Sequence, residues 1–98
     1  MAKFENYWSE MKMNIYLVRR TDNWDYDQYD SFVCVAESEE QAKLLNPQYD
    51  PYFETEMFYD FNRNYCDWAS SPDLLEVIKI GVSDEDKVRV ILASYNAG

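Results

Sequence analysis

Four short segments rich in apolar and β-branched residues stand in two pairs, with a helix signal between the pairs. The segments cover residues 14–19, 31–36, 75–80 and 88–95. Runs of this length and composition favour β-strands, and strands joined by a short link usually pair. The order therefore predicts an α+β fold, with a four-stranded, mostly antiparallel sheet and helices on one face. Segment 31–36 is apolar on both faces, which predicts a central strand.

The helix signal begins at Ser38. Gln41 follows three residues later, as in a capping box, and Glu39 and Glu40 suit the positive end of a helix dipole. Asn46-Pro47 predicts the end of this helix.

A second helix is predicted to begin at Asp50-Pro51, since aspartate is a good N-cap and proline fits the first turn. Its apolar stripe would have a spacing of four residues and consist of Phe53, Met57, Phe61 and Tyr65. The aromatic content of this stretch also fits a strand.

Residues 1–12 predict a short amphipathic helix. Phe4, Tyr7, Trp8 and Met11 would share one face of it, opposite polar residues. This face either packs on its own domain or docks on a partner or a second copy, so a homo-oligomer is one expectation. The chain has 98 residues, which fits a single domain over residues 1–98 with the core in residues 13–98.

The net charge of −10 lies in the middle of the chain. Residues 22–60 hold eleven acidic side chains against Lys43 alone. Such a field repels nucleic acid and anionic membranes and attracts basic surfaces, so we expect a basic protein or ribonucleoprotein partner and no direct nucleic-acid or membrane binding. There is no apolar run of 18 residues and no secretory signal in residues 1–12, which predicts a cytoplasmic protein.

The residue types for common catalytic and metal chemistry are scarce. The chain has no histidine, and Cys34 and Cys66 are far apart in sequence and fit free thiols in a reducing compartment. The acidic run from Asp22 to Asp30 lacks the glycine and glutamate of an EF-hand loop, which favours a solvated turn. A small domain also leaves little room for a substrate cleft. The sequence therefore predicts a protein that is not an enzyme and has no cofactor or metal.

Acidic and aromatic residues alternate between positions 22 and 68. Aromatic rings are good interface anchors, and surrounding carboxylates steer a basic partner, so one hypothesis is nucleic-acid mimicry. The other interpretation is that half of these rings form the core and the acids keep the surface soluble. The residues predicted to contact a partner are Trp24, Asp25, Tyr26, Asp27, Tyr29 and Asp30, followed by Glu54, Glu56 and Asp60.

Several stretches near the two ends of the chain resemble a family of small uncharacterised acidic proteins of tailed bacteriophages and prophages. The matching stretches are residues 15–22, 26–33, 36–42 and 90–98. The resemblance implies a phage-encoded accessory protein in the host bacterial cytoplasm, and it carries no catalytic residues to transfer. Small acidic phage proteins often resemble inhibitors of host defence, anti-CRISPR proteins among them, in type and size. We therefore expect an inhibitor of a host nucleic-acid-handling or defence complex, or alternatively a self-assembling structural or regulatory accessory protein.

Overall fold

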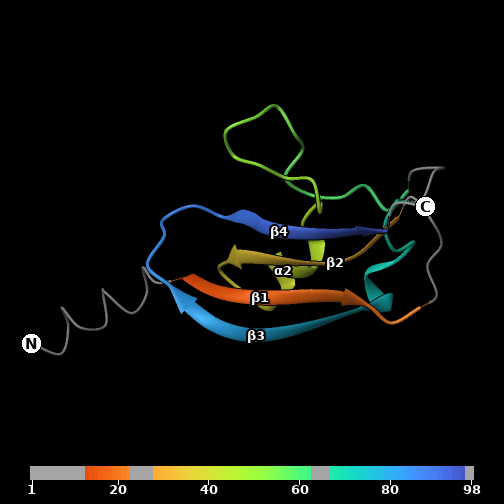
Figure 1. Ribbon diagram of the computed structural model, residues 1–98, viewed down its shortest axis with the longest axis horizontal. Coiled ribbons are helices and arrows are strands. Elements are labelled where there is room, and N and C mark those ends of the chain that lie inside the picture. Colours follow the sequence, from red (N-terminus) through yellow and green to blue (C-terminus); the bar gives the residue numbers. More distant parts are fainter. Residues whose placement is uncertain (1–12, 23–27, 63–66, 97–98) are drawn as a thin grey trace, which may run out of the picture.

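The computed structural model describes residues 13–22, 28–62 and 67–96, which are coloured in Figure 1. Strands β1 (Met13–Arg20), β2 (Gln28–Ala36), β3 (Leu75–Ser83) and β4 (Arg89–Asn96) form one sheet in the order β3-β1-β2-β4. Each neighbouring pair of strands is antiparallel. The predicted four-stranded sheet is confirmed, and β2 lies in its interior as expected.

Within the described ranges, one short α-helix, α2 (Glu39–Leu44), follows β2, and a 3-10 turn, η1 (Pro72–Leu74), leads into β3. Figure 1 shows α2 behind the sheet. The predicted cap of α2 is present, because the Ser38 hydroxyl accepts a hydrogen bond from the Gln41 amide at 3.1 Å. The Gln41 side chain accepts in turn from the amide of Glu37 at 2.8 Å, one residue earlier than in a standard capping box.

The two faces of the sheet differ. Strand register places Tyr16 opposite Cys34 and Val18 opposite Phe32, and these four side chains are buried. They belong to one core with Leu45 of the α2 C-cap and several residues that follow α2, so this face is the covered face. The alternate residues point the other way, because successive side chains of a strand lie on opposite sides. We call that side the open face.

Trp68 is the largest fully buried side chain among the residues that the structure describes. Its ring centroid lies 5.4 Å from that of Phe32. The backbone amide of Tyr29 donates to the Asp67 carbonyl at 2.7 Å, which fixes the segment before Trp68 against β2. Trp68 and Ala69 of this segment therefore supply a central part of the core.

The prediction of a second helix after Asp50 is wrong. Residues 51–54 form turns, and the described residues that follow, up to position 62, form no helix. The Asp50 side chain accepts from the Tyr52 amide at 2.9 Å, and the Thr55 hydroxyl accepts from the Asp50 amide at 2.9 Å. Side chains that bond nearby backbone in this way compete with helix formation, and aromatic residues add little helix propensity.

The remaining predictions concern the two ends of β1. The N-terminal helix predicted in residues 1–12 lies outside the described residues. After β1, the turn predicted from Asp22 to Asp30 ends earlier than expected, because Gln28 and Tyr29 already pair with Asn96 and Tyr95 of β4. Across the described ranges, no helix is both long and apolar enough to cross a membrane.

Candidate functional site

The residues predicted to contact a partner fall in three places. Four of them lie outside the described residues, namely Trp24, Asp25, Tyr26 and Asp27. Tyr29 and Asp30 are in β2, and the last three are in the loop after α2, namely Glu54, Glu56 and Asp60. The described predicted contacts therefore belong to two elements, a strand and a loop, and each has its own surroundings.

Tyr29 is half-buried and packs against the core cluster. Its ring meets the Tyr95 ring edge-on, with centroids 4.8 Å apart. Cross-strand aromatic pairs of this kind stabilise a sheet. Tyr29 therefore has a clear structural role at the joint between β2 and β4.

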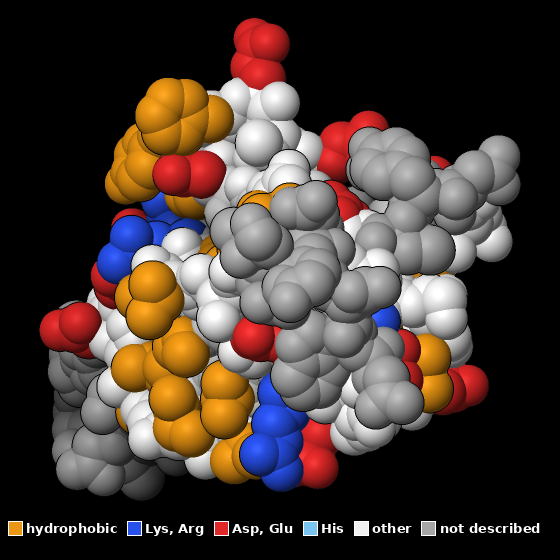
Figure 2. All heavy atoms as spheres, turned by 45° about the vertical axis from the view of Figure 1, so that its right-hand side comes forward, with side chains coloured by type: hydrophobic (Ala, Val, Ile, Leu, Met, Phe, Trp, Pro, Cys, Tyr) orange, Lys and Arg blue, Asp and Glu red, His pale blue; other side chains and the backbone are white. Residues whose placement is uncertain are grey.

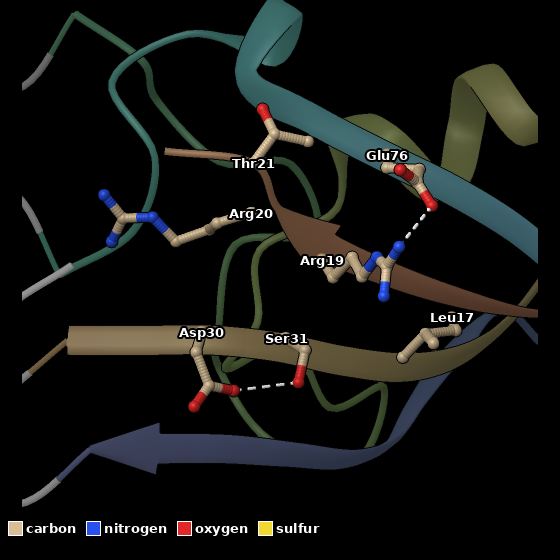
Figure 3. A pocket seen from close by; sticks show the side chains of 7 residues that line it. All are labelled: Leu17, Arg19, Arg20, Thr21, Asp30, Ser31 and Glu76. Carbon is tan, nitrogen blue, oxygen red and sulfur yellow. Dashed lines mark hydrogen bonds and ion pairs between the residues drawn. The ribbon is translucent and has the colours of Figure 1, made fainter. Parts of the chain in front are cut away.

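Asp30 lines a shallow hollow of about 470 Å³ at one end of the open face (Figure 3). The Ser31 hydroxyl donates to its carboxylate at 2.8 Å. Across the hollow, the Arg19 guanidinium pairs with the Glu76 carboxylate at 2.8 Å. Figure 3 shows Arg19 reaching from β1 to β3 while Asp30 and Ser31 lie together on β2. Because positive and negative groups are both present, this hollow has no marked preference for a basic ligand.

Arg20, which also lines this hollow, closes the β1–β2 hairpin. Its guanidinium is buried and binds both carboxylate oxygens of Asp22, at 2.9 and 2.8 Å. A third nitrogen donates to the Gln28 side chain at 3.2 Å. The hydrogen bond and charge of Arg20 hold the pKa of Asp22 below its usual value. This acidic residue of the hairpin therefore stabilises the fold.

The loop between α2 and the core segment at Trp68 has a different character. Tyr52 and Phe53 are each 71% exposed, and Phe58 is 49% exposed. Large apolar rings are usually removed from water, so three exposed rings in one loop indicate a contact surface. Carboxylates interleave with them, and positions 44–62 contain no Lys or Arg. We call this surface the acidic aromatic loop; it consists of Asp50, Tyr52, Phe53, Glu54, Glu56, Phe58 and Asp60.

The loop projects from the body of the domain. Figure 1 shows it extending beyond β4, and Figure 2 shows hydrophobic side chains and carboxylates close together at that end. Its base is closed by backbone hydrogen bonds: the Asn46 amide donates to the Met57 carbonyl at 2.9 Å, and the Tyr59 amide to the Leu44 carbonyl at 2.9 Å. The two ends of the loop are therefore held side by side directly after α2.

The tip of the loop is also held by its own hydrogen bonds. The Thr55 hydroxyl lies between the Asp50 amide, 2.9 Å away, and the Asp50 carbonyl, 3.2 Å away. The Phe53 amide donates to the same carbonyl at 3.2 Å. These bonds fix the backbone around Tyr52 and Phe53, so part of the entropy cost of ordering the loop on binding is already met.

Tyr52 already has a cation against its ring. The Lys87 ammonium, from the β3–β4 connection, lies 5.0 Å from the ring centroid. This distance is within the range of a cation–π interaction. The position of Lys87 shows that this ring accepts a basic side chain in the geometry that the fold provides.

A second hollow, of about 320 Å³, lies beside the loop and is lined by Asn46, Gln48, Thr55, Glu56 and Asp60. Its side chains are polar and its only charged groups are carboxylates. Amide and carboxylate oxygens accept hydrogen bonds from guanidinium and ammonium groups. The hollow suits a Lys or Arg side chain beside the exposed rings.

The contacts predicted from the sequence include carboxylates of this candidate site, namely Glu54, Glu56 and Asp60, but none of its rings. Tyr52, Phe53 and Phe58 belong to the acidic–aromatic alternation, yet the helical spacing of Phe53 suggested a packed stripe. The signal that distinguishes them is Asp50-Pro51 followed by Thr55, a combination typical of a self-bonded turn.

Two observations in the described part of the chain concern metal binding and thiol chemistry. In that part, no three His, Cys, Asp or Glu side chains lie together as a metal site would require. Burial raises the pKa of the Cys34 thiol to about 12, which keeps it protonated and unreactive at neutral pH.

Comparison with protein-family models, with curated proteins and with solved structures finds no match for this chain. The resemblance to phage proteins therefore rests on the quoted stretches of sequence alone. The function has to be argued from the surfaces that the fold presents.

Proposed function

We propose that this chain is a phage-encoded accessory protein that binds and inhibits a host nucleic-acid-handling or defence complex in the bacterial cytoplasm, as anti-CRISPR proteins do. It acts by stoichiometric binding and not by catalysis. The observation that carries the proposal is the acidic aromatic loop: exposed Tyr52, Phe53 and Phe58 stand on a hydrogen-bonded backbone among carboxylates, in a stretch without Lys or Arg.

In this proposal the carboxylates and the aromatic rings contribute to binding in different ways. The carboxylates raise the rate of encounter with a positively charged surface and exclude acidic surfaces. The rings supply apolar contact area at a small entropy cost, because Tyr and Phe have few rotatable bonds and the backbone beneath them is already fixed. Carboxylates on a projecting loop can occupy a basic groove that otherwise receives phosphates, which is the nucleic-acid mimicry hypothesis in structural form.

The contact surface is centred on the loop and extends to the other predicted residues. Asp30 lies on β2 at the edge of a charge-balanced hollow, and its carboxylate already accepts a hydrogen bond, so we assign it a secondary role. Trp24, Asp25, Tyr26 and Asp27 have the same acidic–aromatic composition as the loop, and we include them in the proposal on their sequence alone.

The test is capture of bacterial proteins on three immobilised forms of the full chain. The native chain should retain a basic protein or complex, and the double variant Tyr52→Ala/Phe53→Ala should lose it by more than tenfold. The variant Glu54→Gln/Glu56→Gln should weaken capture, and raising the salt from about 0.1 M to 1 M should do the same, since the screening length falls from about 10 Å to about 3 Å.

The matched control is Glu39→Gln/Glu40→Gln, which removes the same charge from exposed positions of α2. It should capture as much of the same protein as the native chain does. If both charge variants weaken capture equally, net charge alone is responsible and the loop is not the site. If the ring variant captures normally, the proposal is wrong.

A further inference from the structure

The open face of the sheet carries an apolar band that crosses all four strands. Strand register places Ile78, Leu17, Val33 and Leu92 in one row, one residue from each strand. Leu17, Val33 and Ile78 are half-buried, and Leu92 is 68% exposed. Figure 2 shows hydrophobic side chains gathered beside basic and acidic side chains on this side of the molecule. With adjacent strands about 4.8 Å apart, the row is about 14 Å long.

The rows on either side set the limits of this band. On one side Glu76, Arg19, Ser31 and Ser94 form a polar row, and the Arg19–Glu76 pair leaves no net charge there. On the other side the row is Gly81, Ile15, Val35 and Arg89, and Arg89 pairs with Glu85 at 2.8 Å, so its charge is balanced. The band is therefore an uncharged strip between a neutral polar edge and the end of the sheet where β1 begins.

At that end of the sheet, side chains of the open face are buried and not exposed to solvent. Met13 and Val35 share the open face with Ile15 by register and alternation, and both are buried although neither belongs to the core cluster of the covered face. A hollow of about 470 Å³ lined by Ile15, Val82, Ser83 and Asp84 opens beside them. The chain enters β1 at this point.

We propose that residues 1–12 of the same chain cover the apolar band, with Phe4, Tyr7, Trp8 and Met11 packed against it. In a helix, the spacing of these four residues would place their side chains on one face, and residues 2–12 would measure about 16 Å, close to the width of the band. The segment joins the sheet at Met13, on the face and at the end where the band begins.

Two further arguments select this occupant. The attached segment has an effective concentration of the order of millimolar at the band, which a separate protein rarely reaches. Its own charges also balance, since Lys3 and Lys12 offset Glu5 and Glu10, so the neutral face does not repel it. The acidic aromatic loop is a separate surface, and this inference stands whether or not the loop binds a partner.

A double-mutant cycle on the full chain tests the contact. We expect Trp8→Ala and Leu92→Ala each to raise the unfolding equilibrium constant by about tenfold, and the double variant to raise it by clearly less than the hundredfold that independent sites would give. The matched control is Leu44→Ala, on α2, which should be additive with Trp8→Ala.

Two measurements determine what covers the apolar band: the concentration dependence of the coupling, and nuclear Overhauser contacts of Trp8. Coupling that is the same at every protein concentration, with nuclear Overhauser contacts from the Trp8 indole to the methyl groups of Leu17 or Val33, supports docking within one chain. Coupling that grows with concentration would mean that the segment docks on a second copy, and additive effects without such contacts would mean that it does not dock on this face; either result overturns the inference.

Discussion

The tip of the acidic aromatic loop and the segment at Trp68 have similar compositions, but their rings differ in burial. Both place large rings next to carboxylates, yet Phe53 is 71% exposed while Trp68 is fully buried. The loop satisfies its backbone with its own side chains, so its rings are free to face solvent. The segment at Trp68 is tied to β2 through Asp67, so its ring enters the core. The hydrogen-bond partners of the backbone, and not the number of aromatic residues in a segment, therefore decide which rings remain available for a partner.

The largest expected effect is on stability, and it compares a ring in the core with a ring on the loop. Trp68→Ala should destabilise the fold by about 3–5 kcal/mol, because it leaves a large cavity beside Phe32. Phe53→Ala should change stability by less than about 0.5 kcal/mol, because its ring is exposed. Urea denaturation of both variants measures the difference, and equal losses would show that the loop ring is packed and not presented.

The next effect separates structural from surface carboxylates. Asp22→Asn should cost about 2 kcal/mol at neutral pH, since it removes a charged hydrogen-bond partner of buried Arg20. The folded-state pKa of Asp22 is lowered, so this stabilisation is complete above the ordinary value of 3.8 and is lost as the pH falls through the lower folded value. Denaturation from pH 7 to pH 2 should show the gap between native and variant chains closing in acid.

Glu54→Gln is the matched change on the loop. Its side chain is exposed, so its effect on stability should be small at every pH. A pH-independent loss in Asp22→Asn would contradict the assigned role of the Arg20–Asp22 pair.

A smaller effect tests whether the loop is held before it binds. Thr55→Val keeps the shape of the side chain but removes the hydroxyl that bonds both backbone groups of Asp50, which should cost about 1 kcal/mol. The hydrogen exchange of the loop amides near Asp50 should rise, while β1 and β2 amides rise less. Thr21→Val removes a hydroxyl bonded to Leu74 instead and should leave loop exchange unchanged. Unchanged loop exchange in Thr55→Val would mean that the tip is not ordered by these bonds.

The smallest effect concerns the cation already at the loop. Lys87→Ala removes the ammonium 5.0 Å from the Tyr52 ring, at a cost to stability of about 0.5 kcal/mol. It also frees the ring and removes a positive charge, so affinity for a basic partner should rise severalfold in calorimetry. Weaker binding would show that Lys87 itself contacts the partner.

The sequence predicted the regular part of the molecule well because each signal there is local. Alternation in the strands, the Ser38 cap and the central position of β2 all follow from neighbouring residues. The prediction of a helix after Asp50 was wrong because it rested on apolar spacing and did not consider side chains that form hydrogen bonds with the nearby backbone. The burial of Trp68 depends on contacts with β2, far away in sequence, which no local pattern records.

The same limit applied to the candidate site. Glu54, Glu56 and Asp60 could be predicted as contacts because charge is visible in the sequence and carboxylates stay at the surface. Which rings accompany them depended on the loop backbone, and the apolar band of the open face depended on a register shared by four strands.

Mapping the surface that a captured partner contacts tests the central claim most directly. Backbone amide resonances of the full chain, recorded during titration with the purified partner, report which residues change environment. The account predicts that the largest shifts fall on positions 50–60, with β1 and β3 nearly unchanged. Shifts centred on the open face around Leu17 and Val33, with the loop unaffected, would contradict it.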